Sequence, residues 1–68
     1  MSFTTFRTGD IFHYPKRPSL FYIVTNDNTN LGGYGPGSIE FCTFPKMGAH
    51  HFYKLQRHLN EQGCIKLT

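Results

Sequence analysis

Hydrophobic and polar positions alternate along much of the chain, and this alternation favours β-strands. Segment 20–25 is apolar on both faces of an extended chain. One face carries Leu20, Tyr22 and Val24, and the other carries Phe21, Ile23 and Thr25. A strand with two apolar faces is covered on both sides, so we predict that this one is central in a sheet.

Two more strands are predicted, one before and one after this segment in the sequence. Segment 11–14 is β-prone and follows the turn Thr8-Gly9-Asp10, and it ends in a basic, proline-containing loop at residues 15–18. In segment 38–44, Ile39, Phe41 and Thr43 alternate with Glu40 and Cys42, which predicts a half-buried strand. Between residues 26 and 37 the periodicity is lost and glycines accumulate, so we expect a long loop there.

The hydrophobic period changes near the C-terminal end. Between about residues 49 and 62, Phe52, Leu55 and Leu59 recur at helical spacing, and Gly63 follows at the position of a helix C-cap. We predict a helix over this range, and then a short strand at 64–68 with Ile65 and Leu67 directed inward. The expected fold class is α+β and β-rich: a small antiparallel sheet with one helix in the C-terminal half of the chain.

Composition bounds this picture. The 68 residues are 38% hydrophobic and 16% aromatic, which is typical of a folded chain with room for one core, so we expect a single domain over 1–68. No stretch approaches the roughly 20 apolar residues of a membrane span, and residues 1–7 lack the apolar core of a signal peptide. We therefore expect a cytoplasmic protein, monomeric or weakly dimeric, with Cys42 and Cys64 as reduced thiols.

The first part of the chain resembles a known class of small domain. The opening Phe6-x-x-Gly9-Asp10-Ile11, the basic loop and the strands 20–25 and 39–44 look like the start of small SH3-like β-barrels. The resemblance implies a barrel of three to five strands that binds peptides or nucleic acid without catalysis. A helix over residues 49–62 departs from it, because such barrels carry only a short helical turn before their last strand.

Catalysis and metal binding are not expected. Neither cysteine lies in a local signature that pairs a nucleophile with a base, and the acidic residues are scattered along the chain. Cys42, His50, His51 and Cys64 are zinc-ligand types, but their spacing does not match the closely paired ligands of structural zinc sites. The glycine-rich stretch leads into a strand, whereas a phosphate cradle leads into a helix. We therefore assign no catalytic residue, no cofactor and no metal.

Two binding hypotheses remain. The first is a small protein that regulates or inhibits a larger protein, of the kind found as viral accessory proteins, through the loop and a basic helix face. Its contacts are expected at Leu31, Tyr34, His50, His51, Lys54, Arg57 and His58. The alternative is a small basic nucleic-acid-binding module of SH3-like type, consistent with a net charge of +3. Its phosphate contacts are expected at Lys16, Arg17, Lys54 and Arg57.

Overall fold

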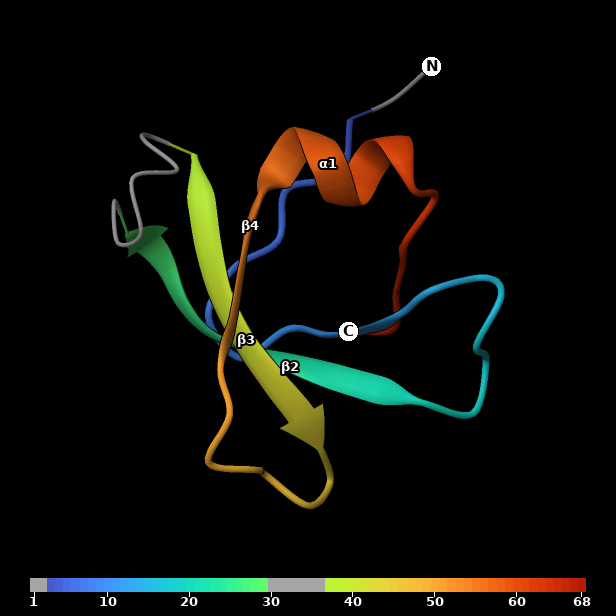
Figure 1. Cartoon of the computed structure of the whole chain (residues 1–68). Coiled ribbons are helices and arrows are strands. Elements are labelled where there is room, and N and C mark those ends of the chain that lie inside the picture. The colour runs from blue at the N-terminus through green and yellow to red at the C-terminus, as the bar shows by residue number, and fades with distance from the viewer. Residues whose placement is uncertain (1–2, 30–36) are drawn as a thin grey trace.

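Within the residues that the structure describes, the alternating segments pair into one antiparallel sheet of five strands, to which a single short helix is added (Figure 1). This computed structural model describes residues 3–29 and 37–68, and of residues 28 and 29 only the strand backbone. The elements in chain order are β1 (Ile11–His13), β2 (Phe21–Thr29), β3 (Ser38–Phe44), β4 (Phe52–Leu55), α1 (Gln56–Glu61) and β5 (Ile65–Lys66). The predicted α+β, β-rich class is thereby confirmed.

The strands lie in the order β4-β3-β2-β1-β5, so β2 is central, as its two apolar faces predict. Every neighbouring pair is antiparallel. Among the described residues β4 and β5 are the two edges of the sheet, with no ladder between them, and the closed barrel that the resemblance implies is not confirmed. The loop expected from residue 26 does not begin there, because β2 continues to Thr29 through two irregularities in its pairing with β3.

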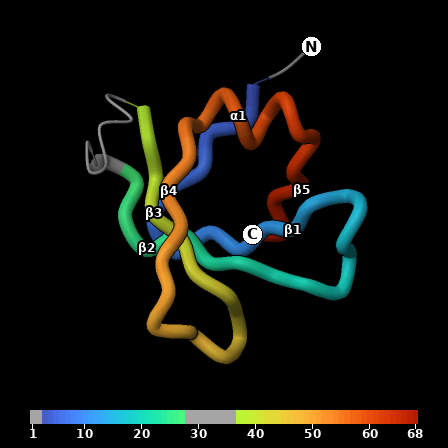
Figure 2. The backbone as a smooth tube through the Cα atoms, viewed as in Figure 1, coloured from blue at the N-terminus to red at the C-terminus, as the bar shows by residue number. Residues whose placement is uncertain are grey.

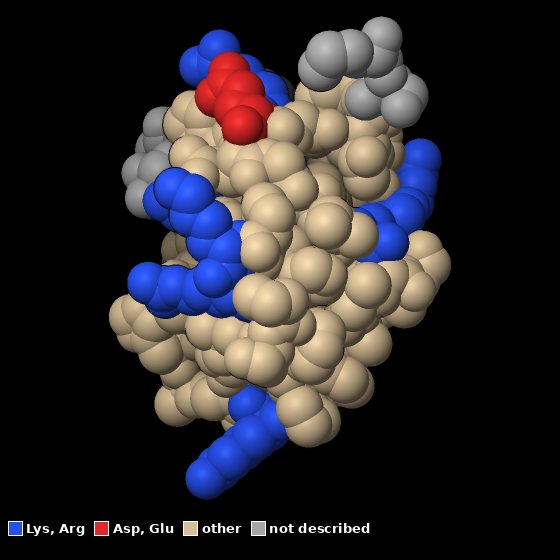
Figure 3. Space-filling view, turned by 90° about the vertical axis from the view of Figure 1, so that its right-hand side faces the viewer, with Lys and Arg blue, Asp and Glu red and all other residues tan. Residues whose placement is uncertain are grey.

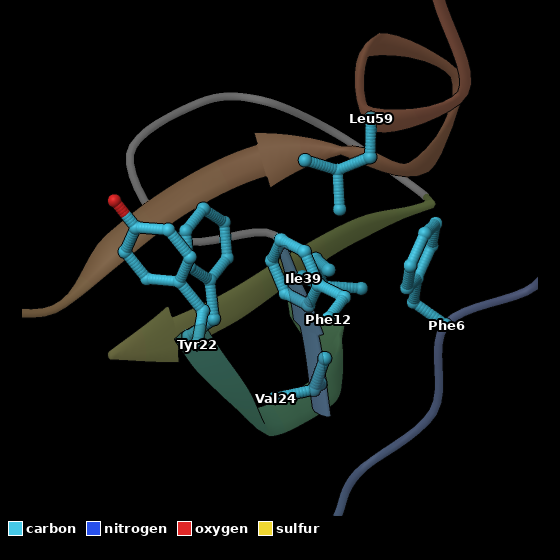
Figure 4. Packing of buried hydrophobic residues seen from close by; sticks show 7 residues of the cluster. Phe6, Phe12, Tyr22, Val24, Ile39 and Leu59 are labelled. Carbon is cyan, nitrogen blue, oxygen red and sulfur yellow. The ribbon is translucent and has the colours of Figure 1, made fainter. Parts of the chain in front are cut away.

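The core is largely aromatic and lies between one face of the sheet, α1 and the N-terminal segment. Figure 4 shows Phe12 at its centre, with Leu59 pointing in from the helix and Phe6 from the N-terminal segment. The phenol oxygen of Tyr22 points away from the cluster. Buried members of the cluster are Phe6, Phe12, Tyr22, Val24, Ile39, Phe41 and Leu59.

Strand β3 buries part of its second face as well, more than the expectation of a half-buried strand allows. Ile39 and Phe41 face the core as predicted, but Cys42 on the opposite face is also fully buried. Cys42 pairs with Ile23 of β2, so the apolar second face of the central strand adjoins it. A thiol is small enough to disappear between such neighbours.

The predicted helix over residues 49–62 is wrong in its first half. Residues 52–55 form β4, which pairs with β3 so that Phe52 lies opposite Phe41, and only Gln56–Glu61 are helical. Aromatic side chains at 52 and 53 fit a pleated strand, and this cross-strand pairing outweighs the helical spacing of Phe52, Leu55 and Leu59. The short helix removes the main departure from the resemblance described above.

Beyond the helix, one prediction is confirmed and one is wrong. Gly63 follows the C-cap residue Gln62 and ends α1 with a φ of +75°, as a capping glycine does. Its N–H donates to the Asn60 carbonyl, and that of Cys64 donates to the Leu59 carbonyl. By contrast, Ile65 and Leu67 are not directed inward, since they are 46% and 51% exposed. Within the described residues, the two-residue strand β5 pairs only with β1 at the edge of the sheet, and both side chains stay about half exposed.

The N-terminal segment runs beside α1 (Figure 2). Two side-chain amides of the helix hold it there. Gln56 accepts from the Phe6 N–H at 2.8 Å and donates to the Phe6 carbonyl at 2.7 Å. Asn60, one turn further along the helix, repeats the pattern with the N–H and carbonyl of Thr4 at 2.7 and 2.9 Å. The two amides thus bond the backbone groups that a neighbouring strand would otherwise bond, and they hold Phe6 in the core.

Candidate functional site

A groove lies between the connection that follows β1, the core face of β2, β3 and β4, and the end of α1. It consists of two adjoining hollows of about 430 and 460 Å³ that share Tyr14, Lys54 and Gln62. The first is also lined by Lys16, Arg17, Tyr22, Phe41 and Phe52. The second is also lined by His58, Leu59 and Glu61. We refer to both hollows together as the aromatic groove.

Aromatic rings form the floor of the groove. Phe52 stacks on Phe41 with ring centroids 5.5 Å apart and an angle of 23°, and Tyr22 meets Phe52 edge to face at 5.8 Å. Tyr14 in turn contacts Tyr22 at 5.8 Å. Phe52 and Tyr14 are only half-buried, so their outer surfaces are accessible to a ligand. The β4 register creates this floor, because it places Phe52 on the core face beside Phe41.

Tyr14 is neutral at physiological pH. Burial raises the pKa of its phenol to about 12, with further contributions from Cys64 and Tyr22. Burial likewise raises the pKa of the neighbouring Cys64 thiol to about 11. A neutral phenol does not repel an anionic ligand, and a protonated thiol of this kind is a poor nucleophile.

Basic side chains surround the aromatic floor. Lys16 and Arg17 extend from the connection after β1, and Lys54 reaches the groove from β4, opposite Ile39. All three are exposed and make no ion pair within the described chain. Figure 3 shows the side of the molecule that carries this connection and the end of α1, and Lys and Arg side chains outnumber acidic ones there. The rim is therefore suited to an anion.

The structure brings some of the predicted site residues together and separates others. Lys16, Arg17, Lys54 and His58 all line the groove, although only His58 of these lies on the helix. His50 contacts Phe52 edge to face at 4.8 Å, just outside it. Arg57 is exposed on α1 but does not line the groove. The basic helix face is thus corrected: His50, His51 and Lys54 precede α1.

One predicted residue, His51, lies on another face, and two are not described. The ring of His51 reaches Glu40 on the opposite face of the sheet, with Nδ1 3.5 Å from Oε2. Leu31 and Tyr34 lie outside the described residues. Sequence reasoning missed Glu61 and Gln62 as lining residues, and no pattern marked them, because their approach to Tyr14 and Lys54 depends on where α1 ends.

A separate polar cluster occupies the opposite face of β2, β3 and β4. Glu40 accepts hydrogen bonds from the hydroxyl of Thr25 at 2.7 Å and the phenol of Tyr53 at 2.8 Å. These two bonds, helped by nearby His51 and opposed by partial burial, lower the pKa of Glu40 below its ordinary value. The bond from Tyr53 to Glu40 raises the pKa of the Tyr53 phenol. Glu40, which the alternation places on the face opposite Ile39 and Phe41, links three strands there.

The described residues contain neither a cluster of metal ligands nor a disulfide. Within residues 3–29 and 37–68, no group of three or more His, Cys, Asp or Glu side chains is arranged to hold a metal ion. Both cysteines are free thiols. The helix in the described ranges is not long and apolar enough to cross a bilayer.

No protein-family model, curated protein or solved structure matches this chain.

Proposed function

We propose that this chain is a small non-enzymatic module that binds single-stranded nucleic acid in the aromatic groove. The observation that carries the proposal is the convergence of Lys16, Arg17 and Lys54 on a floor that presents Tyr14 and Phe52. Proteins that bind single strands combine a basic track for the phosphates with aromatic rings on which bases stack. The second hypothesis from the sequence is therefore the one that the groove supports best.

Regulation or inhibition of a larger protein stays as the competing proposal. It depends on Leu31 and Tyr34, whose placement is not described, and on a basic helix face that the fold divides between β4, its preceding loop and α1. We also propose a cytoplasmic location, with which two free thiols are compatible.

The test is fluorescence anisotropy of a mixed-sequence single-stranded 12-mer with the full chain. If Lys16, Arg17 and Lys54 each contact a phosphate, raising the salt from 50 to 200 mM weakens binding about 20-fold, and Lys54→Ala reduces that factor to about sevenfold. Tyr14→Leu removes a stacking surface and lowers affinity about tenfold.

Lys46→Ala is the matched control, because Lys46 is an exposed lysine that does not line the groove. We expect it to bind as the parent chain does. Circular dichroism establishes that each variant is folded before binding is compared. Absence of binding at 20 mM salt, or equal losses in Lys46→Ala and Lys54→Ala, would refute the proposal.

A further inference from the structure

Glu61 places a negative charge in the groove that we propose binds phosphates. Among the described lining residues of the aromatic groove it is the one carboxylate, beside Lys54 and His58. A negative charge there repels the backbone of a bound strand and weakens sequence-independent binding. Phosphate binding by the basic residues therefore does not explain a carboxylate in the groove.

A stabilising role in the fold does not explain Glu61 either. Glu61 makes no ion pair within the described chain, and it is the last residue of α1. A carboxylate at the C-terminal end of a helix faces the negative end of the helix dipole, which disfavours it. Glu61 is also exposed and contributes nothing to the core.

The surroundings of Glu61 match the edge of one nucleobase. A carboxylate offers two adjacent acceptor oxygens and no donor, while the Lys54 ammonium and the Gln62 amide of the same hollow supply donors. Guanine alone among the common bases presents two adjacent donors, N1–H and the 2-amino group, beside an acceptor, O6. Adenine, cytosine and thymine or uracil each present a single donor group on this edge.

Tyr14 connects this hollow to the stacking floor. It lines both hollows, so a base stacked on Tyr14 or Phe52 in the first can direct its hydrogen-bonding edge into the second. Single-stranded bases are read in this way, by stacking on an aromatic ring and hydrogen bonding along the exposed edge. We infer that Glu61, together with Gln62, makes the aromatic groove selective for guanine in a single strand, an inference that rests on the proposed function.

The experiment compares heptathymidylates whose central base is guanine, hypoxanthine, adenine or cytosine. Hypoxanthine retains O6 and N1–H but lacks the 2-amino group. We expect guanine to bind about tenfold more tightly than adenine or cytosine, with hypoxanthine in between. In Glu61→Gln the preference for guanine falls below about twofold, because an amide offers one acceptor where two are needed, and binding of the adenine oligomer becomes tighter as the repulsion disappears.

Glu40→Gln is the control, since Glu40 lies on the opposite face of the sheet, and it is expected to keep the guanine preference. Equal binding of all four oligomers would overturn the inference while leaving the proposed function intact. A preference that persists in Glu61→Gln overturns the role of Glu61. Failure of every oligomer to bind defeats both the inference and the proposed function.

Discussion

At the scale of single residues, Glu40 is kept charged by two hydrogen-bond donors from neighbouring strands. Thr25 lies on β2 and Tyr53 on β4, so the carboxylate on β3 links three strands on one face. These bonds favour the ionised form, and they hold the pKa of Glu40 below its ordinary value of 4.5. A lowered pKa means that the folded state binds this proton less readily than the unfolded chain does.

The stabilisation from Glu40 is therefore complete above about pH 4.5 and is lost as the pH falls through the folded-state pKa. We predict that Glu40→Gln lowers the free energy of unfolding by about 1 kcal/mol at pH 7 and by much less at pH 3. Urea denaturation at both pH values measures the difference. Glu61→Gln, which removes an exposed carboxylate, is expected to change stability by less than about 0.5 kcal/mol. A loss in Glu40→Gln that is the same at both pH values contradicts this account.

At the scale of elements, α1 is too short to be stable alone and is held by what surrounds it. Its first N–H, from Gln56, donates to the carbonyl of Gly37 at 2.9 Å, and Gly63 caps its other end. The reciprocal amide bonds from Gln56 and Asn60 then attach the N-terminal segment along one face. Helix and segment stabilise each other.

We predict that Gln56→Glu loosens this attachment without changing the size of the side chain. A carboxylate still accepts from the Phe6 N–H but no longer donates to the Phe6 carbonyl, so the free energy of unfolding falls by about 1–2 kcal/mol. Urea denaturation gives the loss, and amide hydrogen exchange at Thr4 and Phe6 locates it.

Gln62→Glu is the matched change, because Gln62 is exposed and makes no such bond within the described chain. It is expected to leave the exchange at Thr4 and Phe6 unaltered. Equal protection of these two amides in Gln56→Glu and the parent chain would show that the segment is held by Phe6 packing alone.

At the scale of the whole molecule, one aromatic side chain connects most of the core. The ring of Phe12 contacts Phe6 at 5.2 Å, Phe41 at 5.1 Å and Tyr22 at 5.5 Å, and so joins the N-terminal segment, β3 and β2. A domain of this size has only a few kcal/mol of net stability. Loss of this ring therefore threatens the whole fold.

We predict that Phe12→Ala, at a cost of about 3–5 kcal/mol, leaves the chain largely unfolded at 25 °C. Phe3→Ala is the control, because Phe3 is 60% exposed and is expected to cost less than about 0.5 kcal/mol. Near-ultraviolet circular dichroism and thermal unfolding separate the two outcomes. A cooperative transition in Phe12→Ala close to that of the parent would disprove the central role of this ring.

The sequence by itself determined the features that depend on local patterns. Two apolar faces identify residues 20–25 as the central strand, and alternation places Tyr22 and Val24 on the core side. Gly9 and Gly63 both adopt positive φ, at the turn and the helix end where their surroundings predict it. These features are predictable because strand alternation and a glycine in a left-handed turn depend only on residues close together in the sequence.

Only the tertiary structure decided whether residues 52–55 belong to a helix or a strand. Phe52, Leu55 and Leu59 satisfy a helical spacing, but pairing of β4 with β3 places Phe52 on Phe41, a contact between residues distant in sequence. The aromatic groove depends on the same choice, since it joins a loop, three strands and the helix end. Long-range pairing is not encoded in local periodicity, which is why the basic residues were predictable as candidates while the surface that they share was not.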